Sequence, residues 1–171
     1  GDETAERLKA KLIPAIEALR IGISTDTEAH YGPVVTAQHK AKVEGWIQTC
    51  VDEGAELIVD GRGFQLQGHE KGFFIGPTLF DHVTTDMESY KEEIFGPVLH
   101  IARFKAAEID AVVDAINATG YGLTFGLHTR IDDRVQRIVS RVRVGNIYVN
   151  RNQIGAVVGV QPFGGEGLSG T

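Results

Sequence analysis

The sequence is poor in cysteine, because Cys50 is the only one among its 171 residues. A single thiol excludes an intramolecular disulfide and is typical of a reducing compartment, so we expect a cytoplasmic protein. Cys50 lies in the middle of an apolar stripe of a predicted helix, and no histidine lies at a spacing that would pair with it. We therefore interpret Cys50 as a small buried hydrophobe and not as a nucleophile.

Several other signals are absent from the sequence. No apolar run approaches the ~18 residues of a membrane-spanning helix, and the first residues, GDETAER, are not typical of a signal peptide. The 17 basic residues are dispersed and the net charge is −6, which argues against nucleic acid as a partner. The six histidines have no ligand spacing, so we expect no metal site. Neither a serine nucleophile elbow nor a GxGxxG loop after a strand is present.

The composition that is present is that of a globular protein, with 42% hydrophobic and 23% charged residues. Its length predicts one domain, residues 1–171, with its own core. The sequence contains 21 glycines, well above the average share of about 7%, and the excess gathers in two loops, 61–76 and 155–170. Within the first, residues 61–72 lack the pattern of a phosphate-binding loop and are interpreted as an exposed hairpin or loop. The second contains valines among its glycines, which predicts a shaped loop and not a linker.

Apolar periodicity predicts two helices in the first third of the chain. The first covers residues 4–19, and Pro14 should bend or break it because proline lacks a backbone donor. The second begins at Thr36 and ends at Gly54. Its predicted core face consists of Val43, Trp46, Ile47, Cys50 and Val51. A short strand, 56–60, follows it.

From Val98 onward, strand and helix patterns alternate. Strand candidates cover 98–104, 122–129 and 144–150, and amphipathic helix patterns begin at Ile109 and Ile131. This order predicts an α/β fold with a mainly parallel sheet and helices on both of its faces.

The segment 91–98, KEEIFGPV, is the candidate for ligand contact. In an extended segment Glu93 and Phe95, two residues apart, would point the same way and could face one ligand. A carboxylate accepts hydrogen bonds from sugar hydroxyls and an aromatic face packs against a planar ring, which suits a dinucleotide. The local features alone favour the alternative that the acidic pair is exposed and Phe95 lies in the core.

Four motifs follow one another along the chain: EEIFGP at 92–97, YGLTFGL at 121–127, VGNIYVN at 144–150 and PFGGEGLSG at 162–170. In this order they resemble the C-terminal part of the catalytic domain of the aldehyde dehydrogenase superfamily, over almost the whole chain. Residues 1–97 resemble methylmalonate-semialdehyde dehydrogenase. Residues 99–171 resemble the pyrroline-5-carboxylate (glutamate-semialdehyde) dehydrogenase module of the bifunctional proline-utilisation enzyme. A hybrid of two branches and a natural divergent member are both open.

The resemblance implies roles for five residues. Glu93 would accept hydrogen bonds from the nicotinamide ribose of NAD, with NADP not excluded, and Phe95 would pack near the nicotinamide. Gly155 and Ala156 would anchor the carboxylate of the substrate through backbone N–H groups, because small side chains let the backbone approach an anion. Phe163 would pack on the aliphatic part of the substrate. The alternative is that Gly155 and Ala156 only shape a tight turn.

The resemblance also implies a reaction, the NAD-dependent oxidation of a semialdehyde through a cysteine thiohemiacetal and hydride transfer. The nucleophilic cysteine, the oxyanion-binding asparagine, the glutamate base, the NAD-binding domain and the oligomerisation strand would lie outside residues 1–171. We therefore expect no catalytic residue in this chain, no activity from it alone, and a homo-oligomeric parent. The expected substrate is glutamate semialdehyde, in proline catabolism. The alternatives are methylmalonate semialdehyde, with acyl transfer to coenzyme A, and a non-catalytic remnant or assembly domain.

Overall fold

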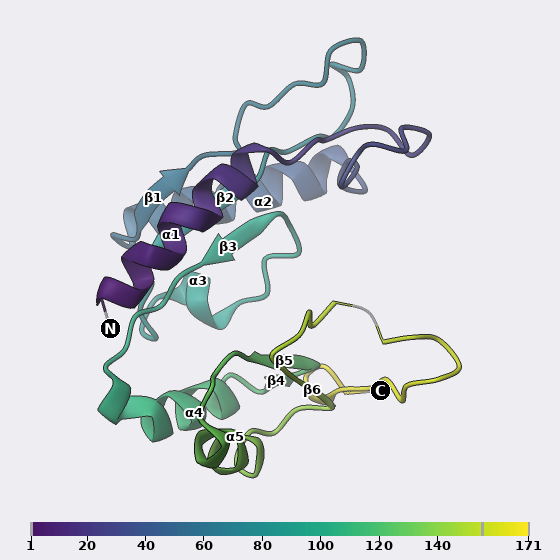
Figure 1. The fold of residues 1–171 in the computed structure, drawn as a ribbon. Helices are drawn as coiled ribbons and strands as arrows, with labels where there is room; N and C mark the ends of the chain where they lie inside the picture. Colours follow the sequence, from purple (N-terminus) through teal and green to yellow (C-terminus); the bar gives the residue numbers. More distant parts are fainter. Residues whose placement is uncertain (1, 155, 171) are drawn as a thin grey trace. The chain divides into compact units, whose positions relative to one another are not determined.

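The computed structural model describes residues 2–154 and 156–170. They form two compact units, Gly1–Arg103 (unit 1) and Phe104–Thr171 (unit 2), as Figure 1 shows. That the two units together form one domain, residues 1–171, stays a prediction.

Unit 1 contains three helices and three strands in its described residues: α1 (Asp2–Glu17), α2 (Ala37–Asp52), β1 (Glu56–Val59), β2 (Thr78–Asp81), α3 (Glu88–Lys91) and β3 (Val98–His100). The elements of unit 2 are the 3-10 helix η1 (Ala106–Glu108), α4 (Ile109–Ala118), β4 (Tyr121–Gly122), β5 (Thr124–Leu127), α5 (Asp132–Val139), β6 (Asn146–Val149) and β7 (Glu166–Gly167). None of the helices in the described ranges has the length and apolar character needed to cross a bilayer.

Helix α1 continues through Pro14, so the alternative of a break at this residue is wrong, whereas the alternative of a bend stays a prediction. Figure 1 shows α1 as one continuous helix. The Pro14 carbonyl accepts a hydrogen bond from Ala18 N at 3.0 Å, so the helical pattern resumes directly after the missing donor. Tertiary contacts hold the helix on both sides of the proline. Lys9 forms an ion pair with Asp81 at 2.7 Å, and Ile16 is buried. These contacts offset the one hydrogen bond that proline removes.

Helix α2 confirms the predicted start and end. The Thr36 side chain accepts a hydrogen bond from His39 N at 3.0 Å, which caps the helix. Gly54 follows the last turn with a φ of +92°, a left-handed conformation that glycine adopts without a steric penalty. The buried face of α2 consists of Val43, Ile47 and Cys50.

The sheet of unit 1 has the order β1-β2-β3, with β1 antiparallel and β3 parallel to the central strand β2. All four residues of β2 are buried. Phe80 packs in the core cluster with α2, whereas the next residue, Asp81, contacts Lys9 of α1. Because successive side chains of a strand point to opposite faces, α1 and α2 cover opposite faces of this sheet. In Figure 1, α1 lies nearer the viewer and α2 lies further back.

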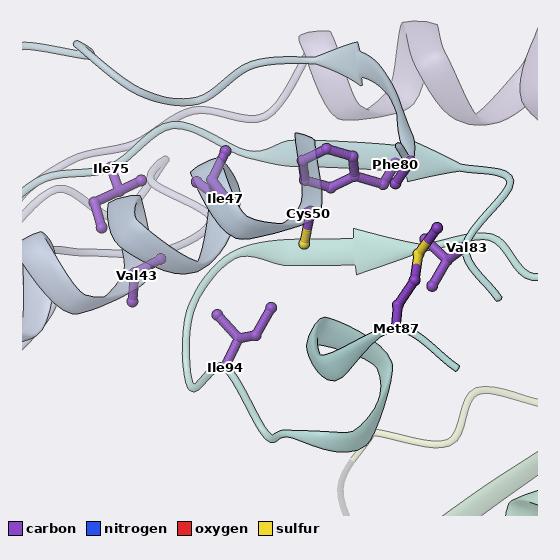
Figure 2. Close-up of a cluster of buried hydrophobic side chains, with 9 residues drawn as sticks. Val43, Ile47, Cys50, Ile75, Phe80, Val83, Met87 and Ile94 are labelled. Atoms are coloured by element: carbon purple, nitrogen blue, oxygen red, sulfur yellow. The ribbon is translucent and has the colours of Figure 1, made fainter. Parts of the chain in front are cut away.

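The core of unit 1 lies between α2 and the sheet, as Figure 2 shows. Its buried members are Val43, Ile47, Cys50, Ala55, Ile75, Phe80, Val83, Met87 and Ile94. Ile94 belongs to the candidate ligand segment, so the core includes the middle of that segment.

Unit 2 contains the predicted strand–helix–strand unit. Strands β5 and β6 are parallel, with Phe125 opposite Ile147, and α5 connects them. Val113 of α4 and Ile138 of α5 pack in one cluster with Phe125, Leu127 and Ile147, so both helices cover the same face of this pair. A second, antiparallel pair joins β4 to β7. The predicted α/β class is confirmed, with parallel pairing in β2–β3 and β5–β6 and antiparallel pairing in β1–β2 and β4–β7.

Candidate functional site

The candidate cofactor segment connects α3 to β3. Ile94 is buried in the core of unit 1, whereas Glu93 and Phe95 on either side of it are exposed. The Phe95 side chain is 70% exposed, which excludes the alternative that it fills the core. In Figure 2 the Ile94 side chain lies with the core side chains of α2. Burial of Ile94 therefore holds the two flanking residues at the surface.

The backbone at Phe95 is not extended, so the geometric premise of the sequence argument is wrong at this residue. Its φ is +51°, in the left-handed region that bulky residues rarely adopt. The Phe95 carbonyl accepts a hydrogen bond from His39 Nε2 at 2.8 Å. A Cβ on the next residue, Gly96, would lie 2.6 Å from Val43 Cγ1, so the backbone there packs directly on α2. Residues of this kind, held in unusual conformations by their surroundings, occur often at functional sites.

The other end of the segment is attached to α2 as well. The carboxylate of Glu53, directly after α2, accepts hydrogen bonds from Glu88 N at 2.6 Å, from Ser89 N at 3.2 Å and from Ser89 Oγ at 2.6 Å. The Ser89 hydroxyl and these amides hold the pKa of Glu53 below its usual value. Helix α2 thus fixes α3 through Glu53 and the Phe95 carbonyl through His39.

Glu93 and Phe95 fit a nucleoside ligand chemically. Among the residues that the structure describes, none forms a hydrogen bond or an ion pair with the Glu93 carboxylate, so its oxygens can accept hydrogen bonds from hydroxyl groups. The ring of Phe95 is exposed one residue beyond Ile94. The roles of the two residues stay predictions.

The candidate substrate residues belong to unit 2. Gly155 lies outside the described residues. Ala156 and Phe163 line one hollow of about 490 Å³, whose other lining residues are Thr124, Val158, Gly159 and Gln161. This volume is within the range of about 300 to 1,000 Å³ that small-ligand pockets occupy. The structure therefore brings two of the three predicted substrate residues to one place.

The loop between Ala156 and Phe163 is closed by its own hydrogen bonds. Val157 N donates to Gln161 Oε1 at 3.0 Å, and Gln161 N donates to the Val157 carbonyl at 2.9 Å. Gly159 between them has a φ of +77°, which glycine tolerates. The role of the Ala156 N–H as a donor to an anionic ligand stays a prediction.

The segment after Phe163 is anchored through its backbone. A Cβ at Gly145 would lie 1.7 Å from the Gly164 carbonyl oxygen, so the two chains approach as closely as glycine permits. Asn146 Nδ2 donates to the same carbonyl at 2.8 Å, and Leu168 N donates to the Gly120 carbonyl at 2.8 Å. These contacts confirm that 155–170 has a defined shape where the structure describes it.

Sequence spacing missed a neighbour of Cys50. His100 Nε2 lies 3.6 Å from Cys50 Sγ, because β3 brings the histidine next to α2. Burial raises the pKa of the Cys50 thiol and lowers the pKa of His100, so both groups favour their neutral forms. Cys50 is fully buried. The interpretation of Cys50 as a core residue therefore holds, and the contact spans 50 residues of sequence without a local signal.

Sequence spacing also missed a buried carboxylate. Asp81 is fully buried, with Arg103 nitrogens at 3.0 and 2.5 Å and Lys9 Nζ at 2.7 Å. Arg103, followed by Lys9, holds the pKa of Asp81 far below its usual value. In the described ranges, Asp81 forms a cluster with Glu56 and His82 that is close enough to hold a cation. Because two cationic side chains already occupy the Asp81 oxygens, this cluster is a poor metal site.

Comparison with known proteins shows which class this fold and these motifs define. The sequence profile of the aldehyde dehydrogenase family matches residues 2–171. The bifunctional protein PutA of Escherichia coli is 42% identical over 172 residues, which cover 99% of this chain and 13% of PutA. The malonate-semialdehyde dehydrogenase of Pseudomonas aeruginosa is 47% identical over 150 residues, which cover 88% of this chain and 30% of that enzyme. The chain therefore belongs to the aldehyde dehydrogenase family.

A solved structure gives the same result. A methylmalonate-semialdehyde dehydrogenase assigned in Sinorhizobium meliloti, solved in complex with NAD, is 42% identical, with a TM-score of 0.91 over 99% of this chain and 34% of that one. The chain spans about a third or less of the length of these relatives. The proline-utilisation enzymes and the semialdehyde dehydrogenases thus each match most of the chain, and neither likeness is confined to one side of residue 98.

Proposed function

We propose that this chain is part of an NAD-dependent aldehyde dehydrogenase that oxidises a semialdehyde to a carboxylate or an acyl group. The observation that carries the proposal is the surface position of Glu93 and Phe95 on either side of the buried Ile94. Family membership and the NAD complex of the Sinorhizobium meliloti relative support it.

In this proposal Glu93 and Phe95 bind the nicotinamide half of the cofactor. The free Glu93 carboxylate accepts hydrogen bonds from the ribose hydroxyls, and the exposed Phe95 ring packs beside the nicotinamide. NAD supplies the hydride acceptor. NADP is the alternative, and the comparison of the two cofactors in one assay decides between them.

The proposed substrate is glutamate semialdehyde. Backbone N–H groups of Gly155 and Ala156 would bind its carboxylate, and Phe163 would pack on its aliphatic chain. The hollow that Ala156 and Phe163 share is large enough for a substrate of this size. The likeness to PutA, and to the 1-pyrroline-5-carboxylate dehydrogenase of Bacillus subtilis at 38% identity, supports this choice.

Methylmalonate semialdehyde, with acyl transfer to coenzyme A, is the second candidate. The 47% identity to the Pseudomonas aeruginosa malonate-semialdehyde dehydrogenase favours it, as does the TM-score of 0.91 to the Sinorhizobium meliloti structure. The two candidates differ in their acceptor, because only the second uses coenzyme A.

We further propose that the nucleophilic cysteine, the asparagine, the glutamate base, the NAD-binding domain and the oligomerisation strand lie outside residues 1–171 of a cytoplasmic, homo-oligomeric parent. Cys50 does not replace the nucleophile, because it is fully buried and burial raises its thiol pKa. A Gly-Gln-x-Cys segment encoded shortly before Gly1 is expected. If the coding sequence before Gly1 lacks it, the alternative of a non-catalytic remnant is favoured.

The first experiment measures turnover by the full-length protein that carries this chain. Each semialdehyde is tested with NAD or NADP and with or without coenzyme A. We expect glutamate semialdehyde to be oxidised with NAD, without a requirement for coenzyme A. Turnover of methylmalonate semialdehyde that requires coenzyme A would instead support the second candidate.

The second experiment compares Glu93→Gln with Glu92→Gln in the same full-length protein. Both residues are exposed carboxylates in one segment, but only Glu93 is assigned to the ribose. We expect Glu93→Gln to lower kcat/KM for NAD about tenfold to a hundredfold, the cost of one to two charged hydrogen bonds, and Glu92→Gln to change it less than about twofold. Equal turnover in the two variants would remove Glu93 from the cofactor site.

A further inference from the structure

The first turn of α2 carries a histidine whose contact the sequence did not predict. His39 Nε2 lies 2.8 Å from the Phe95 carbonyl oxygen, across 56 residues of sequence. A carbonyl oxygen only accepts hydrogen bonds, so His39 Nε2 carries the hydrogen and is the donor. The capping bond from His39 N to Thr36 fixes the turn from which this side chain extends.

The Phe95 carbonyl belongs to the peptide unit with the unusual conformation. At a φ of +51° the Cβ of an aromatic residue is crowded by its own backbone, and such a conformation persists only where neighbouring groups hold it. The two residues that flank Phe95 are held in place. Ile94 is buried in the core, and Gly96 packs against Val43. The hydrogen bond from His39 is the polar contact that fixes the peptide between Phe95 and Gly96.

We propose that His39 is a positioning residue for the cofactor contact. By holding the Phe95 carbonyl, it keeps the Phe95 backbone left-handed and its ring exposed where the nicotinamide is to pack. This inference rests on the proposed function of Glu93 and Phe95, and it assigns His39 no direct contact with the cofactor.

The first test uses the 171-residue chain without cofactor. Three variants are compared by the backbone NMR shifts of Phe95 and Gly96: His39→Ala, which removes the donor, His39→Gln, whose side-chain N–H₂ can replace it, and Gln38→Ala, an exposed neighbour, as the control. We expect His39→Ala alone to shift and broaden the Phe95 and Gly96 signals. Shifts in His39→Ala no larger than those in Gln38→Ala would overturn the proposal.

The second test uses the full-length protein with NAD and the aldehyde that it oxidises. We expect His39→Ala to raise KM for NAD about threefold to tenfold, the effect of one hydrogen bond, with KM for the aldehyde unchanged. His39→Gln is expected to restore KM for NAD to within about twofold of the wild-type value. A merely structural role would lower the active fraction, and hence the maximal rate, in both variants and leave KM for NAD unchanged, which would overturn the proposal.

Glu93→Gln separates a failure of this proposal from a failure of the proposed function. If Glu93→Gln impairs the use of NAD and His39→Ala does not, the inference about His39 alone is wrong. If neither variant changes the use of NAD, the cofactor site itself is wrongly placed, and the inference fails with it.

Discussion

The two segments that carry candidate ligand contacts are held in different ways. In unit 1, side chains hold the segment from α3 to β3: His39 binds the Phe95 carbonyl, Glu53 binds the start of α3, and Ile94 enters the core. In unit 2, the segment after Phe163 is held at its backbone: Gly145 lies directly against the Gly164 carbonyl, which also accepts a hydrogen bond from Asn146 Nδ2.

The difference determines which substitutions each segment can absorb. A side-chain anchor can be replaced by another side chain with the same donor, as glutamine can replace histidine. A backbone contact at glycine has no such substitute, since any Cβ occupies the space of the opposing carbonyl. Another side chain can therefore replace the hydrogen bond to the Phe95 carbonyl, whereas no side chain fits at Gly145.

The cores of the two units differ as well. Unit 1 has nine buried residues in its main cluster and a fully buried carboxylate, Asp81, whereas the cluster of unit 2 has three buried residues. In the described part of unit 2, α4 forms partly exposed ion pairs with Arg137 of α5 and with Arg141, which follows α5, as in Arg141 with Asp114 at 2.8 Å. We expect the stability of unit 1 to depend mainly on its buried contacts. We expect the stability of unit 2 to depend more on its close glycine contacts than on its ion pairs.

The largest expected effect is that of truncation in the core of unit 1. Phe80→Ala removes a fully buried aromatic side chain and should lower the free energy of unfolding by about 4 kcal/mol. Urea unfolding measures this loss, and hydrogen exchange should localise it to unit 1. The control is Phe73→Ala, at a phenylalanine that is 36% exposed, which should cost clearly less. Equal losses in the two variants would contradict the assignment of the core.

The second largest loss of stability is expected at the buried carboxylate of Asp81. Asp81→Asn removes the buried anion that Arg103 and Lys9 share. It should cost about 3 kcal/mol, the lower end for a broken buried pair, because both cations keep Glu6 as a partner. Asp114→Asn in unit 2 removes an exposed partner of Arg141 and should change stability little. Urea unfolding measures both losses. An equal loss of unfolding free energy in Asp114→Asn and Asp81→Asn would contradict the stronger role of the buried carboxylate.

Acidification should remove the contribution of Asp81 to the free energy of unfolding. Its folded pKa is lower than its usual value of 3.8, so its contribution to stability is complete above that value and is lost as the pH falls through the folded pKa. The difference in unfolding free energy between wild type and Asp81→Asn should therefore narrow below about pH 4. The difference between wild type and Phe80→Ala should not narrow in the same way, and parallel urea titrations from pH 7 to pH 3 would show it.

The glycine contact of unit 2 should have an intermediate effect. Gly145→Ala places a Cβ against the Gly164 carbonyl and should cost about 2 kcal/mol, as overpacking does, with faster hydrogen exchange at Leu168. Gly164→Ala is the matched control, because a Cβ there meets no atom within 4 Å. Similar exchange in the two variants would mean that the close approach does not hold the segment.

The smallest expected effect is that of the cap of α2. Thr36→Ala removes the acceptor for His39 N and should cost about 1 kcal/mol in thermal or urea unfolding. Thr36→Ser keeps the acceptor and should recover most of the loss. No difference between the two substitutions would show that the hydroxyl does not stabilise α2.

Local sequence patterns predicted most elements but not their neighbours. The cap at Thr36, the end at Gly54 and the buried face with Val43 and Ile47 follow from the sequence of α2 alone. The predicted alternative of a helix break failed at Pro14, where contacts of Lys9 and Ile16 outweigh one missing donor. The sequence prediction also failed at the backbone of Phe95, because the conformation there depends on contacts with α2, such as that of His39, which lies 56 residues away.

The sequence by itself determined the periodicity of the helices, the order of strands and helices in unit 2, and the four motifs that led to the family. Each of these depends on residues that are close in the chain. Only the tertiary structure decided that Asp81 is buried between Lys9 and Arg103, that His100 lies beside Cys50, and that His39 holds Phe95. These contacts join residues from 22 to 72 positions apart, and spacing along the chain carries no information about them until β2, β3 and α2 pack together.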